Sequence, residues 1–235
     1  MNNPLPIPFS KPTTLRDRVE SYLRTAIMEG HFKGGDRLRE QELCDRLNVS
    51  RPTLREALRT LEGERLIAIE SHRGPTVIQL TEKTAQDLYA MRQLLEGYAA
   101  GEFARMADDQ MIRTLGEAVA QLHHAAAQHD KSVLLAAKRE FYEVLMRGCG
   151  NTELENMLAG LLSRINLLRA KSFTRSERLV ESLVEIDKLY ECIKRRDPEA
   201  ARQAAQEHIE KAMRTALDVL RRERISEPVE QVPLA

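Results

Sequence analysis

Residues Asn48–Glu62 read Asn-Val-Ser-Arg-Pro-Thr-Leu-Arg-Glu-Ala-Leu-Arg-Thr-Leu-Glu. Ser50 is a good helix N-cap, and Pro52 is tolerated in a first turn because its missing N–H would have no partner there. Apolar residues then repeat at helical spacing, at Leu54, Ala57, Leu58 and Leu61. The stretch therefore predicts a short helix with one apolar face.

The other face of this helix carries Arg51 and Arg55, one turn apart, with Thr53 between them. Backbone N–H groups at a helix N-terminus point outward and favour an anion. An arginine fork can also bind guanine or a phosphate. The side chains of this helix therefore suit binding in the major groove of DNA.

The residues on either side support this interpretation. Glu40–Leu47 predicts another short helix, and Asn48-Val49 is a turn of the length that a helix-turn-helix allows. Downstream, the β-rich runs Leu66–Glu70 and Val77–Leu80 surround a Gly-Pro turn and predict a hairpin, which after a recognition helix is a wing. The helix cap, the turn and the predicted wing all flank the helix that carries the two arginines. This arrangement favours a role in DNA contact over arginines that only face solvent.

Several runs between Leu15 and Leu80 form a recognisable pattern. They are Leu23-Arg24-x-x-Ile27-x-x-Gly30, Gly35-Asp36-Arg37-Leu38-x-Glu40-x-x-Leu43, Val49-Ser50-Arg51, Leu54-Arg55-Glu56-Ala57-Leu58-Arg59-x-Leu61-Glu62 and Arg73-Gly74. This pattern resembles the winged helix-turn-helix of the GntR transcription regulators. Two positions depart from it: Pro52-Thr53 stands where the family often has Thr-Pro, and Arg65 sits where a glycine usually precedes the wing.

We expect the recognition helix to contact the major groove through Arg51, Thr53 and Arg55, behind the cap Ser50. Gln41, on the preceding helix, is expected to brace the DNA backbone. The wing residues expected at the minor groove or phosphates are His72, Arg73 and Gly74. One such domain touches too few base pairs for useful specificity, so we expect a homodimer on a palindromic operator in double-stranded DNA.

Composition excludes some classes of protein. The 235 residues include 36 basic and 36 acidic side chains, so DNA affinity must come from local placement rather than from overall charge. The three cysteines are widely spaced and odd in number, which suits reduced thiols. No apolar stretch reaches the roughly 18 residues of a membrane span. We therefore expect a cytoplasmic protein without a membrane partner.

The predicted fold class is mainly α, with four segments. Residues 1–10 form a flexible arm, 11–80 the winged helix-turn-helix DNA-binding domain, 81–225 an all-helical effector-binding and dimerisation domain, and 226–235 a tail. Six helices are expected in the third segment, at about Thr84–Met106, Asp109–His129, Lys131–Arg147, Thr152–Lys171, Glu177–Arg195 and Pro198–Arg224. Their short connections predict an antiparallel bundle.

A second pattern runs through these expected helices. Its pieces are Asp87-x-x-x-x-Arg92-x-x-x-Glu96, Phe141 ahead of Gly150-Asn151, Asp197-x-Glu199-Ala200-Ala201 and His208-Ile209. It resembles the effector domain (FCD domain) of the FadR-type branch of the same family, more loosely than the first resemblance. The two resemblances together cover almost all of the chain expected to be ordered.

Three expected helices each place a cationic or titratable side chain on an apolar stripe, namely Arg92, Lys138 (flanked by Tyr142) and His208. Burying a charge without a partner is unfavourable, so these residues are candidates for an effector site. Other interpretations remain open. Arg92 could pair with Glu96 one turn on, Lys138 could extend to the rim, and His208 could be an ordinary core histidine.

The resemblance implies a metal, which the residues argue against. Many such effector domains bind a metal through an aspartate, a histidine four residues later and two more histidines on the last two helices. Their positions correspond here to Lys138, Tyr142, Ile186 and His208. Lysine repels a cation and isoleucine offers no lone pair. We therefore expect no metal or other cofactor, and a carboxylate held directly by Lys138 and Arg92, with Tyr142 and His208 as further partners.

The sequence thus predicts a DNA-binding transcription regulator, a repressor by family resemblance, controlled by an organic acid. Two alternatives are a regulator that senses a fatty acyl thioester and a DNA-binding protein with no effector. No nucleophile–base set, glycine-rich phosphate loop or paired carboxylates on one stripe can be recognised. No enzymatic activity and no catalytic residue is expected.

Overall fold

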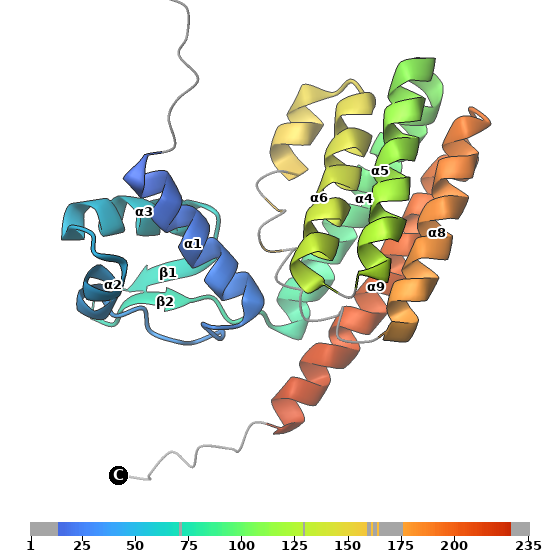
Figure 1. Cartoon of the computed structure of the whole chain (residues 1–235). Helices are drawn as coiled ribbons and strands as arrows, with labels where there is room; N and C mark the ends of the chain where they lie inside the picture. The colour runs from blue at the N-terminus through green and yellow to red at the C-terminus, as the bar shows by residue number, and fades with distance from the viewer. Residues whose placement is uncertain are drawn as a thin grey trace, which may run out of the picture. The chain divides into compact units, whose positions relative to one another are not determined.

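The computed structural model describes residues 14–70, 72–128, 130–158, 161, 164 and 176–226. This part of the chain is mostly helical (Figure 1), which confirms the predicted fold class. Contacts divide it into two compact units, an N-terminal unit ending at Gln79 and a C-terminal unit starting at Leu80. The expected arm at 1–10 lies outside the described residues, as does the expected tail except for Ser226.

The N-terminal unit contains three helices, α1 (Leu15–Glu29), α2 (Glu40–Leu47) and α3 (Arg51–Gly63). Each begins or ends where local chemistry requires. The Thr14 side chain and Asp17 form a capping box on α1, Asn48 ends α2 in the left-handed region, and Ser50 caps α3. The apolar faces of α1 and α3 form the core through Leu23, Leu54, Leu58 and Leu61, all fully buried.

The wing differs from its prediction. Strands β1 (Ile67–Glu70) and β2 (Gly74–Val77) pair antiparallel, with Ile67 opposite Val77 and Glu70 opposite Gly74. The predicted Gly-Pro turn is therefore wrong, because both residues belong to the second strand.

Residues far upstream in the sequence explain the shift of the second strand. The Leu38 N–H donates to the Pro75 carbonyl at 2.8 Å, and the Val77 N–H donates to the Asp36 carbonyl at 2.9 Å. Asp36 to Leu38 thus lie along the other edge of β2, so Thr76 and Val77 are buried between this segment and β1. The turn of the wing moves to the residues just before Gly74.

Arg65 adopts a left-handed backbone conformation between α3 and β1, with φ of 55°. This is one of the two positions at which the sequence departs from the pattern of the family that it resembles, where a glycine is expected. A side chain with a Cβ is disfavoured in this region by about 1–2 kcal/mol. The geometry of the turn therefore explains the usual glycine, and the arginine is a strained substitute.

The C-terminal unit is a helical bundle. Its helices are α4 (Glu82–Met106), α5 (Asp109–Ala127), α6 (Lys131–Gly148), α8 (Ser176–Lys194) and α9 (Pro198–Ser226). Residues 152–158 are also helical, and most of the rest of the helix expected at Thr152–Lys171 lies outside the described residues. Helix α4 begins two residues earlier than predicted because its cap is Thr81, whose side chain accepts a hydrogen bond from the Thr84 N–H.

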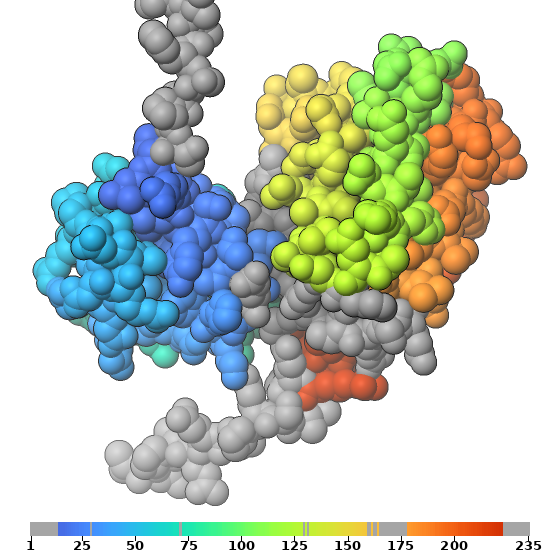
Figure 2. Space-filling view, in the orientation of Figure 1, coloured from blue at the N-terminus to red at the C-terminus, as the bar shows by residue number. Residues whose placement is uncertain are grey.

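Helix α4 packs along α9 and also contacts α6 and α8, while α5 packs against α6 and α8. In the space-filling view the surfaces of α6, α5 and α8 lie side by side (Figure 2). The core between them is apolar, with Phe103, Leu115, Phe141, Leu145, Ile186 and Ile193 fully buried. None of the described helices is long and apolar enough to cross a membrane.

Candidate functional site

Two sets of polar residues stand out, one on the surface of α2 and α3 and one buried in the bundle. On the surface, Arg51 and Arg55 are exposed, on the face of α3 opposite its buried leucines. The expected orientation of both arginines is therefore what the structure shows. Ser50 accepts a hydrogen bond from the Thr53 N–H at 3.4 Å, and their hydroxyls are 2.9 Å apart.

The arginines of α3 are held by residues of α2. Arg51 donates to the side-chain oxygen of Gln41, whose nitrogen in turn donates to Asp45 at 3.0 Å. Nε of Arg55 donates to both carboxylate oxygens of Glu40, at 2.9 and 3.2 Å. Gln41 was expected to contact DNA, whereas Glu40 was missed because a partner fifteen residues away leaves no local pattern.

The wing residues expected at DNA are at the start of β2 and in the turn before it. His72 and Arg73 are exposed, and the Arg73 N–H donates to the Glu70 carbonyl at 3.2 Å. Gly74 has φ of 73°, a conformation that glycine accepts without strain. The guanidinium of Arg37 lies over it, 3.8 Å from the place a Cβ would take.

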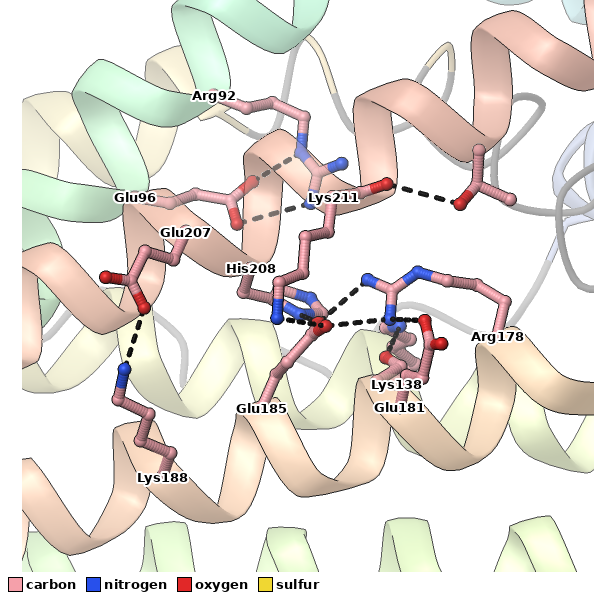
Figure 3. Close-up of polar contacts among 12 residues, drawn as sticks. Arg92, Glu96, Lys138, Arg178, Glu181, Glu185, Lys188, Glu207, His208 and Lys211 are labelled. Carbon is pink, nitrogen blue, oxygen red and sulfur yellow. Dashed lines mark hydrogen bonds and ion pairs between the residues drawn. The ribbon is translucent and has the colours of Figure 1, made fainter.

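The second set, here called the buried cluster, lies inside the bundle and draws residues from four helices (Figure 3). Its members are Arg92 and Glu96 of α4, Lys138 and Tyr142 of α6, Arg178, Ser182 and Glu185 of α8, and His208 of α9. All four residues predicted for the effector site are among them. Hydrogen bonds connect most of the cluster into one network.

Arg92 pairs with Glu96, as one of the open interpretations had it. Its Nε donates to one carboxylate oxygen at 2.6 Å and its Nη2 to the other at 3.3 Å. Nη2 also donates to the Tyr142 hydroxyl at 3.3 Å. The pair is buried, with 1% and 2% of Arg92 and Glu96 exposed, so it differs from an exposed helix-surface pair. Arg92 is therefore not available as a fork for a ligand carboxylate, which corrects that prediction.

His208 joins the Arg92 end of the cluster to the other end. Its Nε2 is 3.1 Å from the Tyr142 hydroxyl, and its Nδ1 is 2.6 Å from Glu185. Arg178 donates to both oxygens of the same Glu185, at 3.1 and 2.8 Å. These partners suit a neutral imidazole in which Nδ1–H donates to Glu185 and Nε2 accepts from Tyr142.

Charges and burial explain the protonation of this pair. Burial lowers the pKa of His208 to about 3, aided by the positive charge of Lys138 and opposed by the hydrogen bond to Glu185. Burial acts to raise the pKa of Glu185, but hydrogen bonds from His208 and Arg178 outweigh it and lower the pKa to about 2. At neutral pH the cluster therefore holds a carboxylate beside an uncharged histidine.

Lys138 is 5% exposed, and its Nζ donates to the Ser182 hydroxyl at 2.9 Å. The alternative in which this lysine extends to the rim is therefore wrong. Among the buried residues that the structure describes, three cations face two carboxylates, a net charge of +1. A buried region with this excess favours an anion as its ligand.

The prediction missed Arg178, Ser182 and Glu185. They are spaced by four and three residues, which places them on one face of α8. That spacing was visible in the sequence as a polar stripe. Nothing local shows, however, that this stripe faces the bundle.

The donor atoms do not fit the metal that the family resemblance implies. At three of the four corresponding positions, Lys138 is a buried cation, Ile186 is fully buried and apolar, and both nitrogens of His208 already have partners. The described residues contain no group of three or more His, Cys, Asp or Glu side chains placed to hold a metal ion. We therefore assign no step to a metal.

Comparison with known proteins identifies both units. Residues 15–77 match the family of bacterial regulatory proteins named gntR, and residues 87–211 match the FCD domain. The HTH-type transcriptional regulator YdhC of Bacillus subtilis (strain 168) is 28% identical over 201 residues, 85% of this chain and 90% of that protein.

Two further comparisons extend these matches. The gluconate operon transcriptional repressor of Bacillus licheniformis is 28% identical over 135 residues, 57% of this chain and 55% of that protein. The crystal structure of a GntR transcriptional regulator from Rhodococcus sp. RHA1 is 26% identical, covers 86% of this chain and 97% of that one, and superposes with a TM-score of 0.73.

Proposed function

Because the chain belongs to the GntR family of bacterial regulatory proteins and carries an FCD domain, we propose that it is a repressor that leaves its operator when the helical unit binds an organic acid. Regulation of transcription by DNA binding is the function of the family. The chain is a DNA-binding transcription regulator and not an enzyme. The proposal concerns the effector, its site and the direction of control.

The buried cluster carries the proposal for the effector. Its described members have an excess of one positive charge, in a place that is closed to bulk water. Lys138 provides a point charge for a carboxylate, with the Ser182 hydroxyl 2.9 Å away. A fatty acyl chain at this place would leave charged groups against hydrocarbon, which is unfavourable. The charges therefore favour a small carboxylate over an acyl thioester.

For DNA, we propose major-groove contacts from Arg51, Thr53 and Arg55, with Ser50 and Gln41 holding the helix and the phosphates. The wing residues His72, Arg73 and Gly74 reach the neighbouring groove or backbone. A homodimer presents two copies of α3 to the halves of a palindromic operator. The exposed positions of Arg51 and Arg55 support this assignment.

Repression is the proposed direction of control. It is supported by the relative named as a gluconate operon transcriptional repressor, which matches 57% of this chain. In this arrangement the acid favours a conformation with low DNA affinity, and the coupling requires that the acid binds that conformation more tightly.

The test of the DNA assignment uses a duplex selected from a random pool by the wild-type protein. Arg55→Ala should lose retardation of this duplex by at least about tenfold, because one arginine contact to a base is worth roughly 1–3 kcal/mol. Arg113→Ala, an exposed arginine of α5, is the control and should bind normally. Equal binding by Arg55→Ala would remove α3 from the interface.

The test of the effector assignment measures thermal stabilisation by a panel of organic acids. A specific ligand stabilises the folded protein in proportion to the logarithm of its concentration above Kd. Lys138→Met should abolish this stabilisation while operator binding persists, whereas Lys83→Met, on the surface of α4, should change neither. If no acid stabilises the wild-type protein, the effector proposal fails and a DNA-binding protein without an effector is the better description.

A further inference from the structure

The segment between α1 and α2 carries an arginine that lies along the wing (Figure 1). Arg37 is directly opposite Thr76 of β2 in an antiparallel bridge. Backbone hydrogen bonds of 2.9 and 2.8 Å on either side of the bridge, made by Asp36 and Leu38, hold this pairing in register. The backbone of Arg37 is therefore fixed to β2 in the way that a neighbouring strand would be.

The Arg37 side chain extends along the wing toward its turn. Residues directly opposite each other in an antiparallel pair share a face, as do residues two apart on one strand. Arg37 therefore lies on the same face of the wing as Thr76 and Gly74. Its Nε and Nη2 are both 3.8 Å from the place that a Cβ of Gly74 would take. The guanidinium thus lies over Gly74, closer to the turn than the backbone of Arg37.

The guanidinium of Arg37 is available to a ligand. The side chain is exposed, and it forms no hydrogen bond or ion pair with any residue that the structure describes. Arg51 and Arg55 of the recognition helix, by contrast, already bind Gln41 and Glu40. The N–H donors of an unpaired arginine form a planar fork that suits two oxygens of a phosphate.

Charges around Gly74 favour an anion at this end of the wing. Arg73, in the turn, is exposed like Arg37. The two strands contribute one carboxylate, Glu70, which is opposite Gly74 and is also exposed. No ion pair joins this carboxylate to either arginine in the described part of the chain. The two arginines outweigh the one carboxylate, so the local charge is positive.

The position of Arg37 indicates which part of DNA it meets. The wing residues proposed at DNA are in the turn and at the first residue of β2, whereas Arg37 is opposite Thr76, further from the turn. A side chain set back on the side of an element that enters a groove meets the sugar–phosphate backbone that borders the groove. Roughly half to two-thirds of the hydrogen bonds between proteins and DNA go to this backbone, and they position the protein without reading the sequence.

Resting on the proposed contact between the wing and DNA, we infer that Arg37 binds a phosphate beside the groove that the wing enters. Arg37 contributes affinity and fixes the wing on the duplex, and it does not select bases. Gly74 contributes by lacking a side chain, because a side chain there would lie against the guanidinium.

The test measures the DNA affinity of the full chain with Arg37→Met, which keeps the aliphatic part of the side chain and removes the charge. The selected duplex and a duplex of unrelated sequence are each titrated at several salt concentrations. Affinity for both should fall by a similar factor of at least about ten, because a hydrogen bond to a charged group is worth roughly that much. The plot of log K against log salt concentration should become less steep by about 1 for each protomer bound.

Two further variants serve as controls. Arg37→Lys keeps a charge for the phosphate and should restore most of the affinity and of the salt dependence. Arg65→Met removes the same charge from an exposed arginine before β1, at the end of the wing away from the turn, and should bind like the wild-type protein. Denaturant unfolding checks that each variant is folded. If Arg37→Met is unfolded, Arg37→Gln takes its place with the same expected results.

Three results would overturn the inference. Wild-type affinity of a folded Arg37→Met variant would show that Arg37 does not contact DNA. A loss of affinity with unchanged salt dependence, which Arg37→Lys does not restore, would mean that Arg37 supports the wing and binds no phosphate. A loss confined to the selected duplex would indicate a base contact. The proposed role of α3 is tested separately by Arg55→Ala and survives all three results.

Discussion

Nε of Arg55 on the recognition helix lies 2.9 and 3.2 Å from the two carboxylate oxygens of Glu40 at the start of the preceding helix. The arginine expected to reach DNA thus already has an anionic partner. The Glu40 side chain is 28% exposed and so partly buried, whereas the Arg55 guanidinium faces solvent. In the proposed complex with DNA, phosphates or guanine compete with this carboxylate for the Arg55 guanidinium.

Replacing Glu40 by glutamine should strengthen operator binding. Exposed ion pairs are worth about 0.2–1 kcal/mol, so the gain in affinity should reach at most about fivefold at low salt. Filter binding or retardation at several salt concentrations measures it. Glu42→Gln is the control, since Glu42 is on the same helix but pairs with Arg39. A gain of the same size in both variants would indicate a general charge effect.

His208 makes the stability of the helical unit depend on pH. In the folded protein its pKa is lowered to about 3, from 6.5 in the unfolded chain, because burial disfavours the charged form. Between these values the unfolded chain binds a proton that the folded chain does not, so stability falls as the pH falls below 6.5. The slope contributed by one such group is at most about 1.4 kcal/mol per pH unit.

Denaturant unfolding at several pH values from 7 to 4.5 would check this dependence. Glu185, with a pKa lowered from 4.5 to about 2, contributes in the same direction only below this window. His208→Gln should remove most of the slope, whereas His123→Gln, which changes an exposed histidine, should leave it. An unchanged slope in His208→Gln would show that another group titrates.

Gly148 at the end of α6 is a position where a methyl group has no room. A Cβ there would lie 2.0 Å from a ring carbon of Phe103, which is fully buried. Overpacking of this kind costs typically 1–3 kcal/mol, which exceeds the roughly 0.5–1 kcal/mol that alanine gains over glycine in a helix. Gly148→Ala should therefore destabilise the protein, as measured by chemical denaturation.

Gly63 at the end of α3 provides the opposite case. No atom lies within 4 Å of the place its Cβ would take. Gly63→Ala should stabilise the N-terminal unit by up to about 1 kcal/mol. A stabilised Gly148→Ala variant would mean that Phe103 can move aside.

Arg65 is a position where glycine should stabilise the protein. Its φ of 55° is disfavoured for a residue with a Cβ, so Arg65→Gly should raise the free energy of unfolding by about 1 kcal/mol. The side chain is exposed, so its loss removes little packing. Arg65→Ala keeps the Cβ and should give no such gain. Equal stability of the two variants would show that the gain does not come from backbone strain.

Local chemistry made the DNA-binding unit predictable from sequence. Ser50 and Pro52 mark the start of α3, Asn48 ends α2, and the apolar spacing gives the buried face. The second strand of the wing was predicted three residues too far along, at Val77–Leu80 and not Gly74–Val77, because it pairs with Asp36 to Leu38 as well as with β1. A pairing partner some forty residues away leaves no trace in the run itself.

The buried cluster was predictable only in part, for a similar reason. Periodicity on a single helix placed Arg92, Lys138 and His208 inside the bundle, and the structure brings them together. Which carboxylate meets which cation depends on how four helices pack, so Glu185 and Arg178 were not anticipated. The partners of a buried charge are a property of the packing and not of the helix that carries it.

Helix α4 begins at Glu82, just after the point where the two units divide, and Arg92 follows about three turns further along the same rod. In the proposed control, an acid that rotates α4 at Arg92 would also turn the direction in which the chain leaves Glu82. The coupling between the binding of the acid and the binding of DNA is then reciprocal. In the proposed control, the factor by which the acid lowers the affinity for DNA must equal the factor by which saturating operator lowers the affinity for the acid.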